Sequence, residues 1–197
     1  MESKQFKELL LQSLEHEMGG VKVYEAALEC VVNPDLREEW QEYLEQTRRH
    51  VEILTALCVS LEVDPQEDSP GRPIVRSLGA ALVQAMEMAL QGGNPNAAQI
   101  VAAECVVLAE TKDHLDWELI GKCIEKLPEE QARAVREAAE HVEDEEDEHL
   151  YHTKGWCREL WIESLGMKAI LPPPEEEKDV KTAIGAARAE QSAPKRR

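Results

Sequence analysis

A glutamate and a histidine one helical turn apart are the residues in this sequence whose types and spacing most directly indicate chemistry. Glu146 and His149 belong to the stretch EDEEDEHLYHTKGWCREL, which begins at Glu143. At helical spacing they occupy two central positions of an otherwise mainly apolar seam, the row of positions that faces the inside of a bundle. A bare carboxylate there is costly unless a partner neutralises it. Because Glu-x-x-His on an inward helix face is typical of bundles that hold two metal ions, the pair predicts a metal site.

Polar residues also interrupt the apolar seams of three other long helices that the sequence predicts, over residues 3–32, 35–61 and 96–126. These residues lie near mid-helix and are Glu17, Thr47, His50, Glu110 and His114, with Asp113 on a neighbouring face. Two cations held close together need anionic oxygens to offset their charge and imidazoles to fix their geometry. The pattern therefore predicts a bound metal, with the ligands Glu17, His50, Glu110, Glu146 and His149. Asp113 and His114 are further candidate ligands.

Proline and glycine mark the ends of the predicted helices. The first long helix ends ahead of Pro34 and the second ahead of Pro65, because a residue that precedes proline disfavours the α region. A shorter helix over residues 74–91 ends at Gly92. A fourth long helix is expected over residues 128–164, with proline in its first turn.

The length and the order of these helices favour one all-α domain. The 197 residues are enough for a full-sized core, and a long crossover occurs in bundles whose second and third long helices run parallel. We therefore expect an antiparallel four-helix bundle with a crossover helix over residues 1–168. Residues 169–197 are predicted to form a largely disordered tail.

Charge and composition exclude several classes of protein. The net charge of −18 argues against a nucleic-acid-binding surface, which needs clustered lysine and arginine. No apolar run reaches the ~20 residues of a membrane span, and the first residues lack the pattern of a secretory signal, so a cytoplasmic protein is expected. The five cysteines are scattered and odd in number, which supports neither a disulfide framework nor a zinc ribbon. A homodimer is left open, because antiparallel bundles often dimerise.

Each polar residue also has an ordinary structural explanation. Taken alone, Glu17 is more often a hydrated acid and His50 a core histidine, and the Thr47 hydroxyl most simply bonds its own backbone. His114 could equally stack against Trp117. A second stripe with His152, Glu145 and Glu148 is expected to face solvent. The coincidence of ligand-type residues at mid-height in all four long helices favours the metal site over these explanations.

These residues resemble the ferritin-like superfamily, which includes rubrerythrins, bacterioferritins and manganese catalases. The resemblance covers about residues 5–165 and rests on Glu17 with Tyr24, on Glu110 and on the Glu146-x-x-His149 motif. The stretches NPDLREEWQEYLEQTRRHVEIL and ALVQAMEMALQGGNPNAAQIVAAECVVLAETKDHLDWELIG are similar to a little-characterised bacterial ferritin-like family linked to stress responses. In that family the acidic-His signature falls on Asp113-His114, so Asp113 competes with Glu110 as the ligand of the third long helix.

The resemblance implies redox chemistry on dioxygen or peroxide at an iron or manganese site, as in an oxidase, a peroxidase or a catalase. Thr47 stands where a standard di-iron site has a bridging glutamate, so sites with one metal, two or none are all left open. The alternative function is a metal-free, stress-associated structural or interaction protein whose polar seam sets helix register. A dimetal hydrolase is a third alternative.

Overall fold

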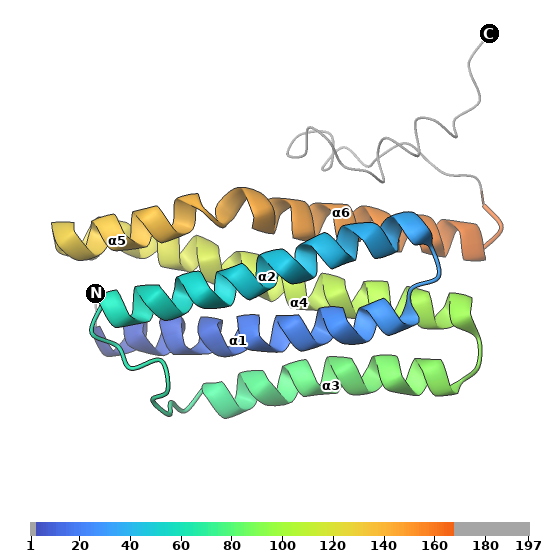
Figure 1. Cartoon of the computed structure of the whole chain (residues 1–197), viewed down its shortest axis with the longest axis horizontal. Helices are drawn as coiled ribbons and strands as arrows, with labels where there is room; N and C mark the ends of the chain where they lie inside the picture. Colours follow the sequence, from blue (N-terminus) through green and yellow to red (C-terminus); the bar gives the residue numbers. More distant parts are fainter. Residues whose placement is uncertain (1–2, 168–197) are drawn as a thin grey trace, which may run out of the picture.

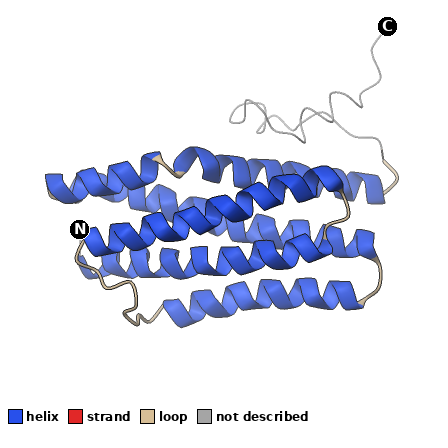
Figure 2. Cartoon of the chain, viewed as in Figure 1, coloured by secondary structure: helices blue, strands red, loops and turns tan. Residues whose placement is uncertain are grey.

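The structure, a computed structural model, describes residues 3–167, and every regular element in that range is helical (Figures 1 and 2). The elements are α1 Ser3–Cys30, α2 Pro34–Ser60, α3 Arg72–Gln91, α4 Pro95–Cys123, the 3₁₀ helix η1 Ile124–Lys126, α5 Glu129–Glu140 and α6 Glu143–Ser164. The predicted all-α class is confirmed. The predicted tail at residues 169–197 lies outside the described residues.

The long helices form a bundle with one helix packed on its outside (Figure 1). Helices α2 and α4 run in the same direction and opposite to α1 and α6. This is possible because α3 carries the chain back along the bundle between them, packed against α1 and α4. The predicted antiparallel, ferritin-like bundle with a crossover helix is confirmed.

The two parallel helices begin with the same local motif. Asn33 caps α2 and its side-chain oxygen accepts from the backbone N–H of Leu36, 3.2 Å away. Asn94 caps α4 and accepts from the N–H of Ala97, also at 3.2 Å. A proline follows each asparagine, where its fixed φ suits the first helical turn. The repeated Asn-Pro pair therefore fixes where both helices start.

The fourth long helix is not continuous, so the prediction of one helix over residues 128–164 is wrong. It divides into α5 and α6 at His141 and Val142. The backbone N–H groups of these two residues bond carbonyls three residues back, at 3.2 and 3.0 Å, which tightens the last turn of α5. Val142 is fully buried in the core, and α6 then starts with four acidic residues, which the positive end of the helix dipole favours.

The buried side chains fall into two hydrophobic clusters with a polar layer between them. The first cluster includes Val23, Leu36, Ala103, Trp156 and Leu160. The second includes Leu10, Leu14, Leu54, Ile120 and Val142. In α1 the second cluster ends at Leu14 and the first begins at Val23, and buried Glu17 lies between them. The two cores therefore hold the four long helices rigidly on both sides of the polar layer.

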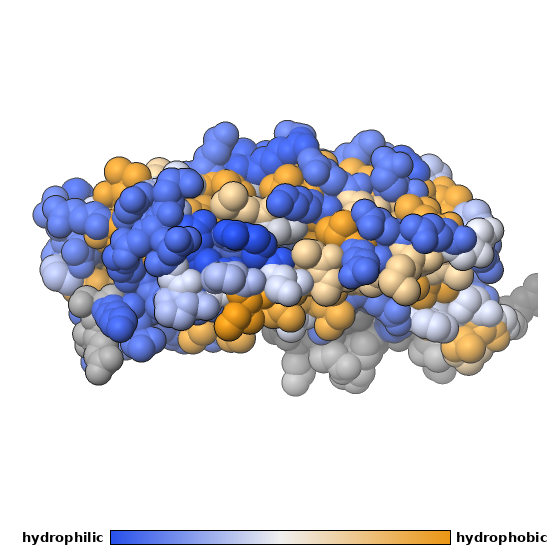
Figure 3. Space-filling model, turned by 90° about the horizontal axis from the view of Figure 1, so that it is seen from below, coloured by the Kyte–Doolittle hydropathy of each residue, from blue (hydrophilic) through white to orange (hydrophobic). Residues whose placement is uncertain are grey.

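The outer face of α3 mixes hydrophilic and hydrophobic residues, as the view from below shows (Figure 3). Ile74, Leu78 and Met88 of this helix are exposed. Within residues 3–167 no helix combines the length and the apolar character that crossing a membrane requires.

Candidate metal centre

Four helices bring six acidic and imidazole side chains together in the polar layer. They are Glu17 from α1, His50 from α2, Glu110 and Asp113 from α4, and Glu146 and His149 from α6. Each is at most 3% exposed. The five residues predicted as ligands therefore lie together, and Asp113 lies with them.

Glu146 is common to two potential ligand sets. One set is His50, Glu146 and His149, and the other is Glu17, Asp113 and Glu146; in each set the ligand atoms lie within 4.8 Å of one another. An Oε1 atom of Glu146 lies 2.9 Å from His50 Nδ1 and 3.6 Å from His149 Nδ1. Glu110 adjoins the first set, since its Oε2 lies 3.5 Å from His149 Nδ1. The geometry suits two cations that share one carboxylate.

Many polar atoms of this centre have no hydrogen-bond partner within the described part of the chain. They are Glu17 Oε2, His50 Nδ1, Glu110 Oε2, Asp113 Oδ1, both carboxylate oxygens of Glu146, and His149 Nδ1. Two pairs of these atoms approach each other, His50 Nδ1 with Glu146 Oε1 at 2.9 Å and His149 Nδ1 with Glu110 Oε2 at 3.5 Å, and each pair can share a proton when no cation is bound. Buried polar atoms are almost always paired, so such a group of unpaired ligand-type atoms needs an explanation. Cations bound among them would satisfy both the oxygens and the ring nitrogens.

Outer hydrogen bonds hold both histidines so that Nδ1 faces the centre. His149 Nε2 donates to Gln46 Oε1 at 2.7 Å, and His50 Nε2 donates to Glu145 Oε2 at 2.8 Å. Arg49 holds the other oxygen of Glu145 at 3.0 Å. The expectation that Glu145 faces solvent holds only in part, because its carboxylate is partly exposed but also bonds His50 and Arg49 of α2. Glu148 is exposed, as expected. Such bonds fix the tautomer and orientation of a metal-binding imidazole.

A substitution of Gln46 tests whether its hydrogen bond to His149 contributes to metal binding. Gln46→Leu keeps the bulk of the side chain but removes the oxygen that accepts from His149 Nε2. We expect metal affinity to fall about 10- to 100-fold, as is typical for loss of an outer-shell partner. Competition titration against a chelator measures the change. Gln41→Leu, an exposed glutamine on the same helix, is the control, and equal affinity in the two variants would contradict the assigned role.

An aromatic residue follows the acid by seven positions in both α1 and α4, and each contacts the acid of the other helix. Trp117 Nε1 of α4 donates to Glu17 Oε1 at 2.7 Å. The Tyr24 hydroxyl of α1 lies beside Glu110 and helps to lower its pKa. The two halves of the chain thus support each other's carboxylates.

Burial and mutual repulsion set the pKa values of the centre. Burial raises the pKa of Glu17 to about 8, and the charge of Glu110 adds to this. Burial, with neighbouring carboxylates, also raises the pKa of Asp113 and of Glu146 well above their ordinary values. Burial opposes ionisation of Glu110 too, but the hydrogen bond and charge of His149 prevail and lower its pKa. Without a cation, the centre therefore retains protons on several of its carboxyl groups.

Burial also acts on the imidazole of His50. It lowers the His50 pKa to about 4, and the charge of His149 contributes. His50 is therefore neutral at pH 7, which is the form that binds a metal ion.

Thr47 and His114 belong to neither of the two potential ligand sets. The Thr47 hydroxyl donates to the Tyr43 carbonyl at 2.9 Å, which confirms that it bonds its own backbone. A Cβ added at Gly20 would lie 3.3 Å from Thr47 Cγ2, so α1 and α2 approach closely here. His114 lies outside the buried centre and partly exposed, with Nδ1 3.3 Å from Asp147 Oδ1 and its ring against Tyr151 rather than Trp117.

A second buried polar group adjoins the centre and was not predicted. Tyr43 donates to Glu39 Oε1 at 2.8 Å, and its oxygen lies 2.9 Å from His152 Nδ1. Trp156 Nε1 donates to the other Glu39 oxygen at 2.7 Å. The expectation that His152 faces solvent is wrong, since it is only 5% exposed. The three-residue step from His149 to His152 was the available signal, because it is also an inward helical spacing.

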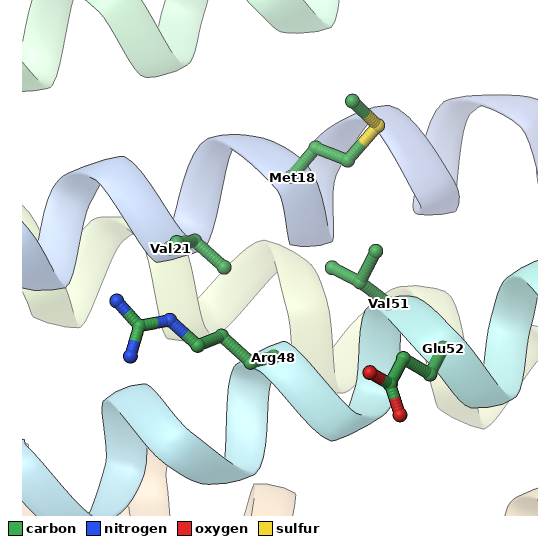
Figure 4. Close-up of a pocket in the computed structure, with 5 residues that line it drawn as sticks. All are labelled: Met18, Val21, Arg48, Val51 and Glu52. Atoms are coloured by element: carbon green, nitrogen blue, oxygen red, sulfur yellow. The ribbon is translucent and has the colours of Figure 1, made fainter.

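A hollow between α1 and α2 lies apart from the ligand residues of the centre (Figure 4). Its volume is about 370 Å³, and it is lined by Met18, Val21, Arg48, Val51 and Glu52. None of the six residues of the centre lines it. The polar layer therefore remains the metal-site candidate among the described residues.

Comparison with known families agrees with this geometry. Residues 10–158 match the family described as "Ubiquinone biosynthesis protein COQ7". No curated protein and no solved structure matches the chain. The ferritin-like resemblance is thus supported, whereas the stress-associated family and manganese find no support. Because the match spans more than half of the chain and includes every residue of the buried centre, this protein belongs to the COQ7 family.

Proposed function

We propose that this protein is a di-iron hydroxylase that inserts an oxygen atom from dioxygen into a ring precursor of ubiquinone. The observation that carries the proposal is the buried group of unpaired carboxylate oxygens and Nδ1 atoms around Glu146. Membership of the COQ7 family supplies the reaction class and favours iron over manganese.

The two ligand sets suggest how the irons would be divided. His50 and His149, with Glu110 beside them, would hold one iron, and Glu17 with Asp113 would hold the other. Glu146 would be shared, because it belongs to both sets. Helix α2 offers Thr47 in place of an acid, and Asp113 of α4 supplies the missing negative charge from another direction.

Bound iron would supply the dioxygen chemistry: one oxygen atom enters a ring C–H bond as C–OH, and the other leaves as water after taking two protons and two electrons from an external reductant. The chain supplies a dry, rigid site, since the ligand side chains are buried between two hydrophobic clusters. Trp117 and Gln46 orient Glu17 and His149 from outside the centre. Such preorganisation keeps the ligand geometry fixed while charge changes at the site.

A substitution of Asp113 tests how the ligands are divided between the two irons. Asp113→Asn keeps the size of the side chain but removes its charge, and we expect iron content to fall from about two to about one per chain, in line with loss of one carboxylate ligand. Metal analysis after anaerobic loading measures this, and Asp116→Asn on the same helix is the control. If the Asp113 variant still binds two irons, the site does not need the Asp113 carboxylate to compensate for the acid that is missing at Thr47.

Product analysis under ¹⁸O₂ tests the reaction itself. The iron-loaded protein is mixed with reduced ring precursors of ubiquinone, dioxygen and a chemical reductant. The proposal expects a product that carries one labelled oxygen atom. Iron-loaded protein that consumes no dioxygen and forms no labelled product would overturn it.

A further inference from the structure

A cleft on the bundle surface reaches the buried centre. We define the α4–α6 cleft as the hollow of about 760 Å³ whose walls come from α4, η1, α5 and α6. Trp117 and Gly121 line it from α4, and Ala139 lines it from α5. Its most buried lining residue is Glu146, which is 1% exposed and whose Oε1 lies 2.9 Å from His50 Nδ1 of the centre. The cleft therefore extends to a residue that belongs to both ligand sets.

The carboxylates that line this cleft range from exposed to buried. Its acidic residues are Glu118, Glu125, Glu140, Glu143, Asp147 and Glu146. The first four are exposed, Asp147 is partly exposed, and Glu146 is buried. Lys122 and Arg136 are the permanently charged bases among the lining residues, so the cleft carries a net negative charge.

We propose that the α4–α6 cleft is the route by which a divalent cation reaches the centre. The exposed carboxylates collect the ion, Asp147 passes it inward, and Glu146 receives it. The inference rests on the proposed function, because it takes the buried residues to be metal ligands. A cleft lined by charges of one sign concentrates the oppositely charged ion and raises its rate of association.

The chemistry of the lining favours a small cation as the occupant. A buried carboxylate that belongs to both ligand sets, next to exposed carboxylates, offers oxygen ligands to a divalent cation. The same acidic lining repels anions, so the route discriminates by charge.

Loading kinetics test the route without turnover. Metal-free protein is mixed with Co(II) alone, and the visible absorption of the bound ion reports both rate and final stoichiometry. In the triple variant Glu118→Gln, Glu140→Gln, Glu143→Gln, we expect loading to slow by about tenfold at low ionic strength, with an unchanged end point. At about 1 M salt, where the Debye length is about 3 Å, the difference should largely disappear.

A matched control comes from a second acidic hollow between α1 and α3. It has a volume of about 620 Å³ and is lined in part by Glu25, Glu29 and Glu87. The triple variant Glu25→Gln, Glu29→Gln, Glu87→Gln changes the net charge equally but leaves the cleft intact. We expect it to load at close to the wild-type rate.

A neutral variant keeps the test decisive if the cleft triple variant fails to fold. A Cβ added at Gly121 would meet nothing within 4 Å, so this position tolerates a side chain. Gly121→Trp narrows the cleft without altering charge, and we expect slower loading that persists at high salt.

The outcomes separate this inference from the proposed function. Equal rates in the wild type, the cleft variants and the control overturn the route, as does equal slowing in both triple variants. A wild-type protein that binds no Co(II) and no Fe(II) at equilibrium overturns the metal centre itself, and the route with it. Selective slowing in the cleft variants supports the route.

Discussion

Glu146→Gln is expected to weaken metal binding by more than about 100-fold, since even outer-shell partners typically contribute 10- to 100-fold. Glu146 belongs to both ligand sets, so its loss removes an anionic ligand from each cation. The amide that replaces it keeps the volume and hydrogen-bonding capacity but carries no negative charge. Metal analysis and chelator competition on protein loaded under identical conditions measure the effect.

The same substitution should leave the metal-free protein at least as stable as the wild type. Burial and neighbouring carboxylates raise the pKa of Glu146, so the metal-free wild type contains a buried acid that resists ionisation. Glutamine fills the same volume without an ionisation penalty. A melting temperature well below that of the wild type would assign Glu146 a structural role instead. Glu148→Gln, at an exposed position of the same helix, is the control for both measurements.

The metal-free protein should lose stability as the pH rises from about 6.5 to about 8. The pKa of Glu17 lies near 8 in the folded chain and near 4.5 in an unconstrained one. Between these values the folded state binds the additional proton, so stability is fully present below pH 4.5 and is lost as the pH rises through 8. Each additional proton bound corresponds to about 1.4 kcal/mol per pH unit as an upper limit. Asp113 and Glu146 act in the same direction, because their pKa values are also raised.

His50 acts with the opposite sign in a lower window. Its pKa falls from 6.5 to about 4 on folding, so its contribution is complete above pH 6.5 and is lost as the pH falls towards 4. The carboxyl groups with raised pKa values therefore determine how the stability of the metal-free protein changes with pH above 6.5. Bound metal should reverse this slope, because cations replace the protons and bind more tightly as those protons leave.

Thermal melts of metal-free and Fe(II)-loaded protein at pH 6.5 and pH 8 measure both slopes under anaerobic conditions. Glu17→Gln should flatten the slope of the metal-free protein, because it removes the group whose pKa lies near 8. A metal-free melting temperature that rises over this interval would contradict the assignment of raised carboxyl pKa values.

The sequence alone placed five of the six residues of the centre on inward helix faces. The repeat of 3.6 residues per turn puts Glu17, His50, Glu110, Glu146 and His149 on the inward faces, and burial follows from that periodicity. The Asn-Pro pairs before α2 and α4 likewise fixed the starts of both helices through local capping.

Only the tertiary structure decided which of these side chains meet. Sequence spacing left Glu110 and Asp113 as alternatives, whereas the rotation of α4 about its axis brings both to the centre. The bonds from Gln46 to His149 and from Glu145 to His50 join different helices, so no single-helix pattern contains them. The break at Val142 and the burial of His152 also depend on how α5 and α6 pack against their neighbours. Helical periodicity determines the inward face of each helix, but the relative rotation and height of the packed helices determine the contacts of the site.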